Sequence, residues 1–197
     1  MIALAGLPGA GKSTVAARVC EEVNARFGPN AMVALGMDGF HLTRAQLKEL
    51  PDPEQALVRR GAPWTFDLPA LIQRLRAIHE AAGHRAVPWP DFHHDVGDPV
   101  DAAFTVSPQT RLVLVEGLYL LHEADGWSAA GRLFDERWYL DAPLATAMDR
   151  LARRHMGAWG LSRKDAEARI AANDRLNAEI VLESRTNADW VLSVEAR

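Results

Sequence analysis

The chain has 197 residues, of which 48% are hydrophobic and 24% are charged, so it is long enough to bury the core of one sizeable domain. Its net charge of −4 and its isoelectric point of about 6.0 argue against a non-specific nucleic-acid binder, because such proteins present a basic surface. A single cysteine, Cys20, excludes an internal disulfide and a cysteine-rich metal site.

The N-terminal segment is apolar for only a few residues and lacks the basic start and the cleavage site of a signal peptide. No apolar run approaches the length that crosses a membrane. We therefore expect a cytoplasmic protein that binds neither membrane nor nucleic acid.

Strand-like and helix-like stretches alternate along the chain, which is typical of a parallel sheet flanked by helices. In the first half we predict strands at 2–5 and 31–37 and a helix at 12–27. Asp52 predicts the start of another helix, because Pro53 follows it in the first turn. A further helix is predicted from Asp67 to about Gly83.

In the second half, residues 111–115 read RLVLV, a strand of the kind that is buried on both faces. Further strands are predicted at 137–140 and 190–194, with a helix from about 141 to 155. Ser162 begins a capping box and predicts a long helix through about 183. Segment 84–108 contains four prolines and few helix signals, and we predict a long functional loop there.

Residues 6–13 read GLPGAGKS, which matches the phosphate-binding pattern G-x-x-x-x-G-K-[ST]. Its glycines let backbone N–H groups point at phosphate oxygens, and the helix that follows adds its positive N-terminus. Lys12 would contact the β- and γ-phosphates of ATP, and the Ser13 hydroxyl would bind Mg²⁺. The apolar strand before the motif and the helix after it are the required context. We predict a nucleotide site formed by Gly9, Ala10, Gly11, Lys12, Ser13 and Thr14.

The second predicted strand runs directly into the segment MDGFH at 37–41. Ligands of doubly wound sheets lie beyond the carboxyl ends of the strands, so we expect Asp38 beside the γ-phosphate. A carboxylate there can accept the proton of an attacking hydroxyl. Phe40 and His41 would line the acceptor pocket. The alternative is that Asp38 is only a turn residue, because Asp favours turns.

The RLVLV strand ends at Glu116, where a P-loop protein normally has Asp. A carboxylate in this position can hold Mg²⁺ directly or through water, because Mg²⁺ prefers oxygen ligands. The alternative is a strand-end acid that is satisfied by a neighbouring arginine.

Arg150, Arg153 and Arg154 recur at i, i+3 and i+4, which predicts a cationic cluster on one helix face. Arginine is well suited to phosphate oxygens. A solvated basic face is the alternative.

Two segments, GAPWTFD and PWPDFHHD, supply further candidates for the acceptor pocket, because aromatic rings stack on sugars or bases and acids bind hydroxyls. These candidates are Trp64, Asp67, Trp89, Asp91 and His94. Arg59 and Arg60 either bind an anionic substrate or end the helix before Gly61. The polar residues of the last helix either line the site or face solvent; they are Asn173, Asp174 and Asn177.

Taken in order, the motifs GLPGAGKST, MDGFH, GAPWTFD, PWPDFHHD, VLVEGLYLL and RLARRH resemble the phosphoribulokinase/uridine kinase family of P-loop kinases over essentially the whole chain. Within that family they are most similar to the bacterial branch described as nucleoside/nucleotide kinase-like or as fructose transport system kinases. The resemblance implies that Asp38 is the catalytic base. It also implies that the arginine segment belongs to a lid over about 150–165, which closes on ATP and excludes water. The family pattern often has Glu-Gly at the position of Glu116, so that residue is consistent with activity.

We therefore expect residues 1–197 to form one doubly wound, mainly parallel P-loop α/β domain with helices on both faces. The expected function is γ-phosphate transfer from Mg·ATP to a hydroxyl of a sugar, a nucleoside or a pantothenate-like alcohol, with Lys12, Asp38 and Arg154 as catalytic residues. The alternative is a regulatory ATPase or switch without an acceptor. A GTPase is disfavoured because the chain lacks an N/T-K-x-D segment. The sequence is compatible with a homodimer.

Overall fold

A computed structural model of the chain describes residues 1–93 and 96–193. Five strands form the central sheet: β1 (Ile2–Gly6), β2 (Met32–Gly36), β5 (Leu112–Glu116), β6 (Glu136–Asp141) and β7 (Trp190–Ser193). Their order is β2-β5-β1-β6-β7, and every pair of neighbours is parallel. The predicted parallel sheet is confirmed.

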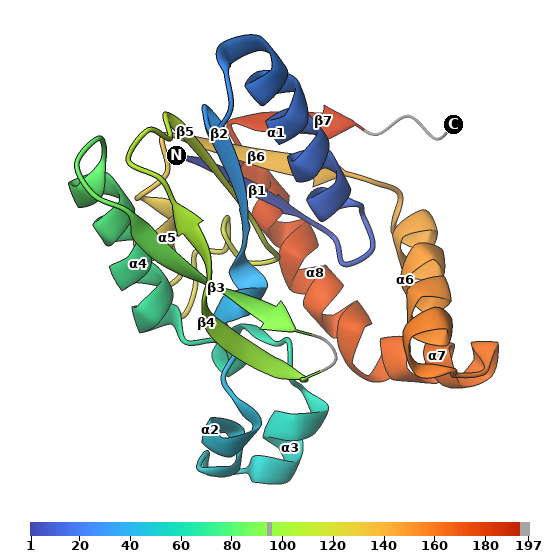
Figure 1. The fold of residues 1–197 in the computed structure, drawn as a ribbon. Helices are drawn as coiled ribbons and strands as arrows, with labels where there is room; N and C mark the ends of the chain where they lie inside the picture. Colours follow the sequence, from blue (N-terminus) through green and yellow to red (C-terminus); the bar gives the residue numbers. More distant parts are fainter. Residues whose placement is uncertain (94–95, 194–197) are drawn as a thin grey trace.

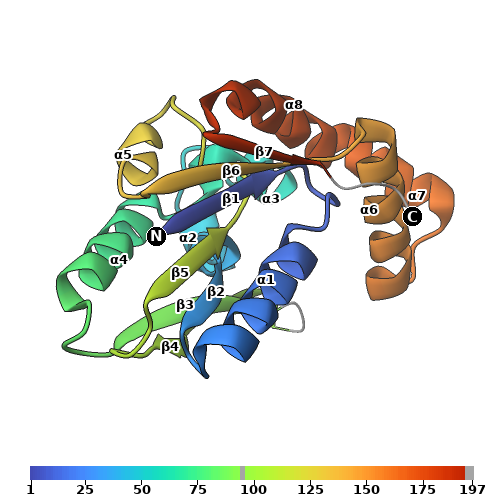
Figure 2. The same ribbon diagram turned by 90° about the horizontal axis from the view of Figure 1, so that it is seen from above.

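Helices cover both faces of this sheet, as a doubly wound fold requires. Figures 1 and 2 show α1 (Lys12–Phe27) on one face and α4 (Leu68–Ala81), α5 (Ser128–Gly131) and α8 (Arg175–Glu183) on the other. Among the described helices, none is both long and apolar enough to cross a bilayer.

The central strands form because their apolar runs are buried from both sides. Ala3, Leu4 and Ala5 of β1 are fully buried, as are Leu114 and Val115 of β5. Such continuous apolar runs are typical of a parallel sheet covered on both faces. Because the strands are parallel, their carboxyl ends meet at one edge, where a ligand site of this fold class lies.

The segment predicted as a long loop is instead a two-stranded antiparallel ribbon, β3 (Val87–His93) paired with β4 (Asp98–Val106). Prolines at 88, 90 and 99 obscure these strands in the sequence, because proline cannot donate to a central sheet ladder. In a ribbon of only two strands each strand has an open edge, so prolines are tolerated there. The ribbon packs against η1 (Met37–Phe40), the turn that contains Asp38.

Between β2 and α4 the chain forms α2 (Arg44–Lys48) and α3 (Pro53–Val58). Asp52 caps α3 as predicted, since its side chain accepts a hydrogen bond from the backbone N–H of Gln55 at 3.0 Å. The predicted helix start at Asp52 is confirmed. α2 was not predicted, and Thr43 caps it with a capping box completed by Gln46.

The long helix predicted from Ser162 is interrupted. It consists of α7 (Arg163–Arg169), the π-helical turn η3 (Ile170–Asp174) and α8. Such wide turns insert an extra residue and often occur at functional sites. The turn contains Asn173 and Asp174, whose side chains border the cavity described below.

α6 (Leu144–Trp159) and α7 have a small core of their own, formed by Leu151, Ala152, Ala166 and Ile170. This cluster is separate from the main core that surrounds the sheet. Figure 1 shows the two helices as a pair that lies beside the body of the protein. They include most of the segment predicted as the lid.

Candidate active site

A cavity of about 300 Å³ lies where the carboxyl ends of β1, β2 and β5 meet. Its walls come from the phosphate loop, η1, the end of α3, the β3–β4 ribbon, and the segment from α6 to α8. The predicted site residues among its lining are Gly9, Lys12, Ser13, Asp38, His41, Glu116 and Arg154.

The phosphate loop between β1 and α1 depends on Gly9. Gly9 has a φ of 81°, in the region that favours glycine. A Cβ atom at this position would lie 2.1 Å from the carbonyl oxygen of Ala147 in α6. Glycine is therefore needed both for the bend of the loop and for the close approach of α6.

Lys12 is buried at the start of α1, and its Nζ donates to the carbonyl oxygens of Gly6 at 3.0 Å and Leu7 at 3.1 Å. Burial lowers the pKa of Lys12, and the carboxylates of Glu116 and Asp38 oppose that shift. The structure thus brings the ends of three separate strands around one cation.

Ser13 and Glu116 are in direct contact, since the Ser13 Oγ donates to Oε1 of Glu116 at 2.7 Å. Burial raises the pKa of Glu116, while Lys12 opposes the shift. A hydroxyl and a carboxylate beside a water-accessible cavity fit Mg²⁺, which prefers oxygen ligands and retains several waters. Within residues 1–93 and 96–193, no cluster of three or more His, Cys, Asp or Glu forms a closed metal site.

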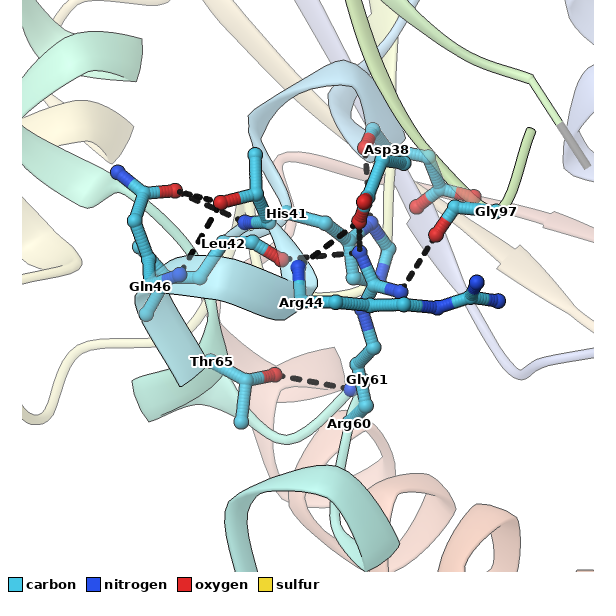
Figure 3. Close-up of polar contacts among 11 residues, drawn as sticks. Asp38, His41, Leu42, Arg44, Gln46, Arg60, Gly61, Thr65 and Gly97 are labelled. Carbon is cyan, nitrogen blue, oxygen red and sulfur yellow. Dashed lines mark hydrogen bonds and ion pairs between the residues drawn. The ribbon is translucent and has the colours of Figure 1, made fainter. Parts of the chain in front are cut away.

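Asp38 lies in η1, directly after β2, and its side chain is exposed to the cavity. The turn is fixed by His41, whose Nδ1 lies 2.8 Å and whose backbone N–H lies 3.1 Å from the carbonyl oxygen of Asp38 (Figure 3). Gly39 allows the ribbon to approach, because a Cβ atom there would lie 2.3 Å from the carbonyl oxygen of Pro90. Asp38 is therefore presented on a rigid turn.

Two aromatic candidates for the acceptor pocket lie in the core instead, which corrects the expectation for Phe40 and Trp89. Trp89 is fully buried, its Nε1 donates to the carbonyl oxygen of Gly36 at 2.9 Å, and its ring meets that of Phe40 edge-on at 4.9 Å. Their side chains fasten the ribbon to η1 and have no surface left for a substrate.

Three further acceptor candidates do not border the cavity. Asp67 caps α4 by accepting from the backbone N–H of Ala70 at 2.9 Å, and Trp64 is exposed outside the cavity. Asp91 lies on β3 but is not part of the lining. His94 falls outside the described residues.

Of the three arginines predicted for the lid, all of which lie on α6, only Arg154 borders the cavity. Arg153 points to Asp149, one turn earlier, with a nitrogen–oxygen distance of 2.9 Å. Asp149 also binds Arg163 at 2.8 Å and thereby joins α6 to α7. Arg150 is exposed and does not border the cavity. An acid four residues earlier decides where Arg153 points.

The structure adds three lining residues that no motif indicated, Arg44, Trp159 and Arg169. The lining also includes Phe92 of the PWPDFHHD motif and His155 of the RLARRH motif. His155 is buried and stacks on Trp159, with ring centroids 4.5 Å apart, while the Arg169 guanidinium lies 4.5 Å from the Trp159 ring centre. Burial lowers the pKa of His155 to about 4, and Arg154 and Arg169 add to the shift, so this histidine is neutral near pH 7.

Asn173 and Asn177 are buried, which excludes the simple surface role for them. Their side-chain oxygens accept from the Arg59 guanidinium, each at 3.1 Å, and Asn173 Nδ2 donates to the carbonyl oxygen of Arg60 at 2.9 Å. These bonds connect Asn173 and Asn177 to Arg59 and Arg60, which follow α3. Arg60 forms part of one wall of the cavity.

No family model matches the chain. A Schizosaccharomyces pombe protein, provisionally named a uridine kinase, is 37% identical over 194 residues, which cover 98% of this chain and 82% of that protein. An Aspergillus versicolor protein, named an ATP-dependent kinase-like protein, is 41% identical over 153 residues, which cover 76% of this chain and 88% of that protein. A crystal structure from Silicibacter, provisionally named a fructose transport system kinase, has a TM-score of 0.86 and 33% identity, and the match covers 97% of this chain and 88% of that one.

Proposed function

Because this chain belongs to the uridine kinase/phosphoribulokinase-like family of P-loop kinases, and is therefore an ATP-dependent kinase, we propose that it phosphorylates a hydroxyl group of a small molecule. The observation that carries this proposal is the position of Asp38. Asp38 shares one cavity with Lys12 and lies beyond the carboxyl end of β2, which β5 separates from β1. An acceptor hydroxyl needs a base at this place for in-line attack on the γ-phosphate.

Asp38 orients the acceptor hydroxyl and takes its proton as the oxygen attacks the γ-phosphorus. The carboxylate is exposed to the cavity and interacts electrostatically with the buried ammonium group of Lys12. A carboxylate in this place can accept the proton of the attacking hydroxyl.

The phosphate groups of ATP are held by the backbone N–H groups of the loop and by Lys12. Arg154, from the lid, adds a planar cation to the γ-phosphoryl group, where charge is distributed over three oxygens in the transition state. Ser13 and Glu116 would hold Mg²⁺, which neutralises phosphate charge when bound.

The pair of helices α6 and α7 forms the lid in this proposal. Its separate small core supports movement as a unit, because few apolar contacts tie such a cluster to the rest of the protein. Closure would exclude water and favour the acceptor hydroxyl over hydrolysis.

The decisive test is the substitution Asp38→Asn, which preserves the size of the side chain and removes its basicity. The acceptor is first found by measuring ADP release with sugars, nucleosides and other alcohols. In the variant we expect acceptor-dependent turnover to fall about 100-fold or more, which is within the range that general base catalysis contributes. Nucleotide affinity, measured by calorimetry, should change little because the phosphate loop holds ATP.

Unchanged turnover in Asp38→Asn would show that the base is elsewhere. If no acceptor stimulates ADP release by the wild-type protein, the proposal of a small-molecule kinase fails and a regulatory ATPase is favoured.

A further inference from the structure

Two arginines on the acceptor side of the cavity differ in what their charges contact. Arg60, at the end of α3, is largely buried and donates to the carbonyl oxygens of Gly97 at 2.6 Å and Leu42 at 2.9 Å. It also forms an ion pair with Asp98 at 2.7 Å. Its charge is therefore neutralised within the protein, and its contacts fasten the ribbon to the start of α2.

Asp98 also contacts the backbone of Arg44. The same oxygen that binds Arg60 accepts the backbone N–H of Arg44 at 2.9 Å. This bond fixes the backbone of Arg44 at the first residue of α2. Asp98 thus joins Arg60 to the first residue of α2, and the nearby charge of Arg44 helps to lower the pKa of Asp98.

The Arg44 guanidinium, by contrast, has no hydrogen bond or ion pair with any residue that the structure describes. It borders the same cavity as Asp38. Figure 3 shows its side chain extending past Gly97. A Cβ atom on Gly97 would lie 2.3 Å from a terminal nitrogen of Arg44, so glycine at this position leaves the space that the guanidinium fills.

The location of Arg44 separates it from the nucleotide. The triphosphate belongs to the phosphate loop and Lys12, whereas Arg44 follows Asp38 by six residues and lies against the tip of the ribbon. A guanidinium presents a planar fork of donors that matches a phosphate or a carboxylate. Arg44 is an exposed arginine whose backbone is held by Asp98 and whose guanidinium makes no hydrogen bond or ion pair with a described residue, so its donors are available for such an anion.

We propose that the acceptor carries an anionic group, a phosphate ester or a carboxylate, in addition to its reacting hydroxyl, and that Arg44 binds this group. This inference rests on the proposed kinase function and specifies the substrate class of the same site. It predicts that sugar phosphates or hydroxy acids are better acceptors than neutral sugars and nucleosides.

The test uses pairs of acceptors that differ in charge: a sugar and its phosphate ester, and a polyol and the corresponding hydroxy acid. ADP release is measured at saturating Mg·ATP. We expect the anionic member to be the better substrate by about 10-fold or more in kcat/KM, and the pair that responds identifies phosphate or carboxylate as the group. Arg44→Gln should reduce kcat/KM for the anionic member by about 10- to 100-fold, mainly through KM.

Lys48→Gln is the matched control, because Lys48 is an exposed cation one turn further along α2 and does not border the cavity. It should leave the kinetics unchanged. Equal or better turnover with the neutral members, or an Arg44→Gln variant with wild-type kcat/KM for the anionic members, would overturn the proposal while the kinase function stands.

A binding measurement decides the question even if no acceptor is turned over, an outcome that would count against the proposed function itself. Sulfate is titrated into protein whose phosphate loop is filled with a non-hydrolysable ATP analogue and Mg²⁺. Wild-type protein and Lys48→Gln should bind sulfate at least about 10-fold more tightly than Arg44→Gln. Equal sulfate affinity in Arg44→Gln and wild type would refute an anion site at Arg44.

Discussion

The donor and acceptor sides of the cavity are built in different ways. The donor side depends on one contiguous loop, residues 6–13, whose backbone geometry follows from its glycines and from the helix that begins at Lys12. The acceptor side is assembled from η1, α2, the end of α3, the ribbon and the start of α8, which side-chain bonds hold together. The donor side is therefore visible as a motif, whereas the acceptor side is visible only in three dimensions.

This difference has a consequence for specificity. Backbone groups in the donor loop contact phosphates in the same way in many proteins with this motif. On the acceptor side, replacing one side chain can alter a wall without disturbing the sheet. We expect substitutions on the two sides to separate ATP binding from acceptor use.

The largest effect is expected for Lys12→Ala on the donor side. This removes the cation beside the β- and γ-phosphates, and loss of one such contact in the transition state typically reduces kcat by about 100-fold or more. Both ATP affinity and turnover should fall, whatever the acceptor. Calorimetry with ATP and ADP-release kinetics measure the two effects.

Lys164→Ala on the exposed surface of α7 is the control for Lys12→Ala. Circular dichroism should show that both variants are folded, since the Lys12 ammonium contacts only loop carbonyls. Activity of Lys12→Ala near the wild-type level would refute the assignment of the loop as the phosphate site.

Sequence reasoning located most of the sheet because its signals are local. The apolar run at β5 and the caps at Asp52 and Asp67 each depend on neighbouring residues, and the structure confirms them. The ribbon was missed because its prolines resemble loop signals. The interruption at η3 was missed because a π-turn leaves the helical pattern of residues almost unchanged.

For the site, the sequence allowed us to predict that residues at strand ends, such as Asp38 and Glu116, lie in one site, because parallel strands end at one edge of the sheet. It failed where a long-range contact decides the direction of a side chain. Trp89 turns into the core to donate to the carbonyl oxygen of Gly36, 53 residues away. The direction of Arg153, by contrast, follows from a local pairing with Asp149 that the sequence analysis did not consider. Arg44 escaped notice because its importance depends on Asp98, 54 residues away.

A smaller effect is expected in the lid, where Arg154 and Arg153 form a matched pair of adjacent arginines. Arg154→Ala should lower kcat by about 10- to 100-fold, because the residue borders the cavity and would stabilise developing phosphate charge. Arg153→Ala should change kcat by less than about twofold, because Arg153 does not border the cavity and its ion pair with Asp149 is exposed to solvent. Equal kinetic losses in the two variants would mean that both arginines act only through the structure of the lid.

The smallest kinetic effect is expected for Asn173→Ala, which tests whether the start of the last helix supports the acceptor wall. Asn173 accepts from Arg59 at 3.1 Å and donates to the carbonyl oxygen of Arg60 at 2.9 Å. Losing these buried bonds should cost about 1–3 kcal/mol of stability. The substitution should also loosen Arg60, which holds Gly97 and Asp98 of the ribbon, and through Asp98 it should loosen Arg44. The KM for the acceptor should therefore rise several-fold, while ATP affinity is retained.

Asn187→Ala separates this positioning effect from a loss of stability alone. Asn187 donates from its side chain to the carbonyl oxygen of Leu121 at 3.0 Å and does not border the cavity, so its loss should lower the thermal midpoint without changing the KM for the acceptor. Thermal unfolding and acceptor kinetics are measured on both variants. If Asn173→Ala destabilises the protein but leaves the acceptor KM at the wild-type value, the acceptor wall does not depend on this link. A rise in KM for the acceptor alone would show that the two sides of the cavity are supported independently.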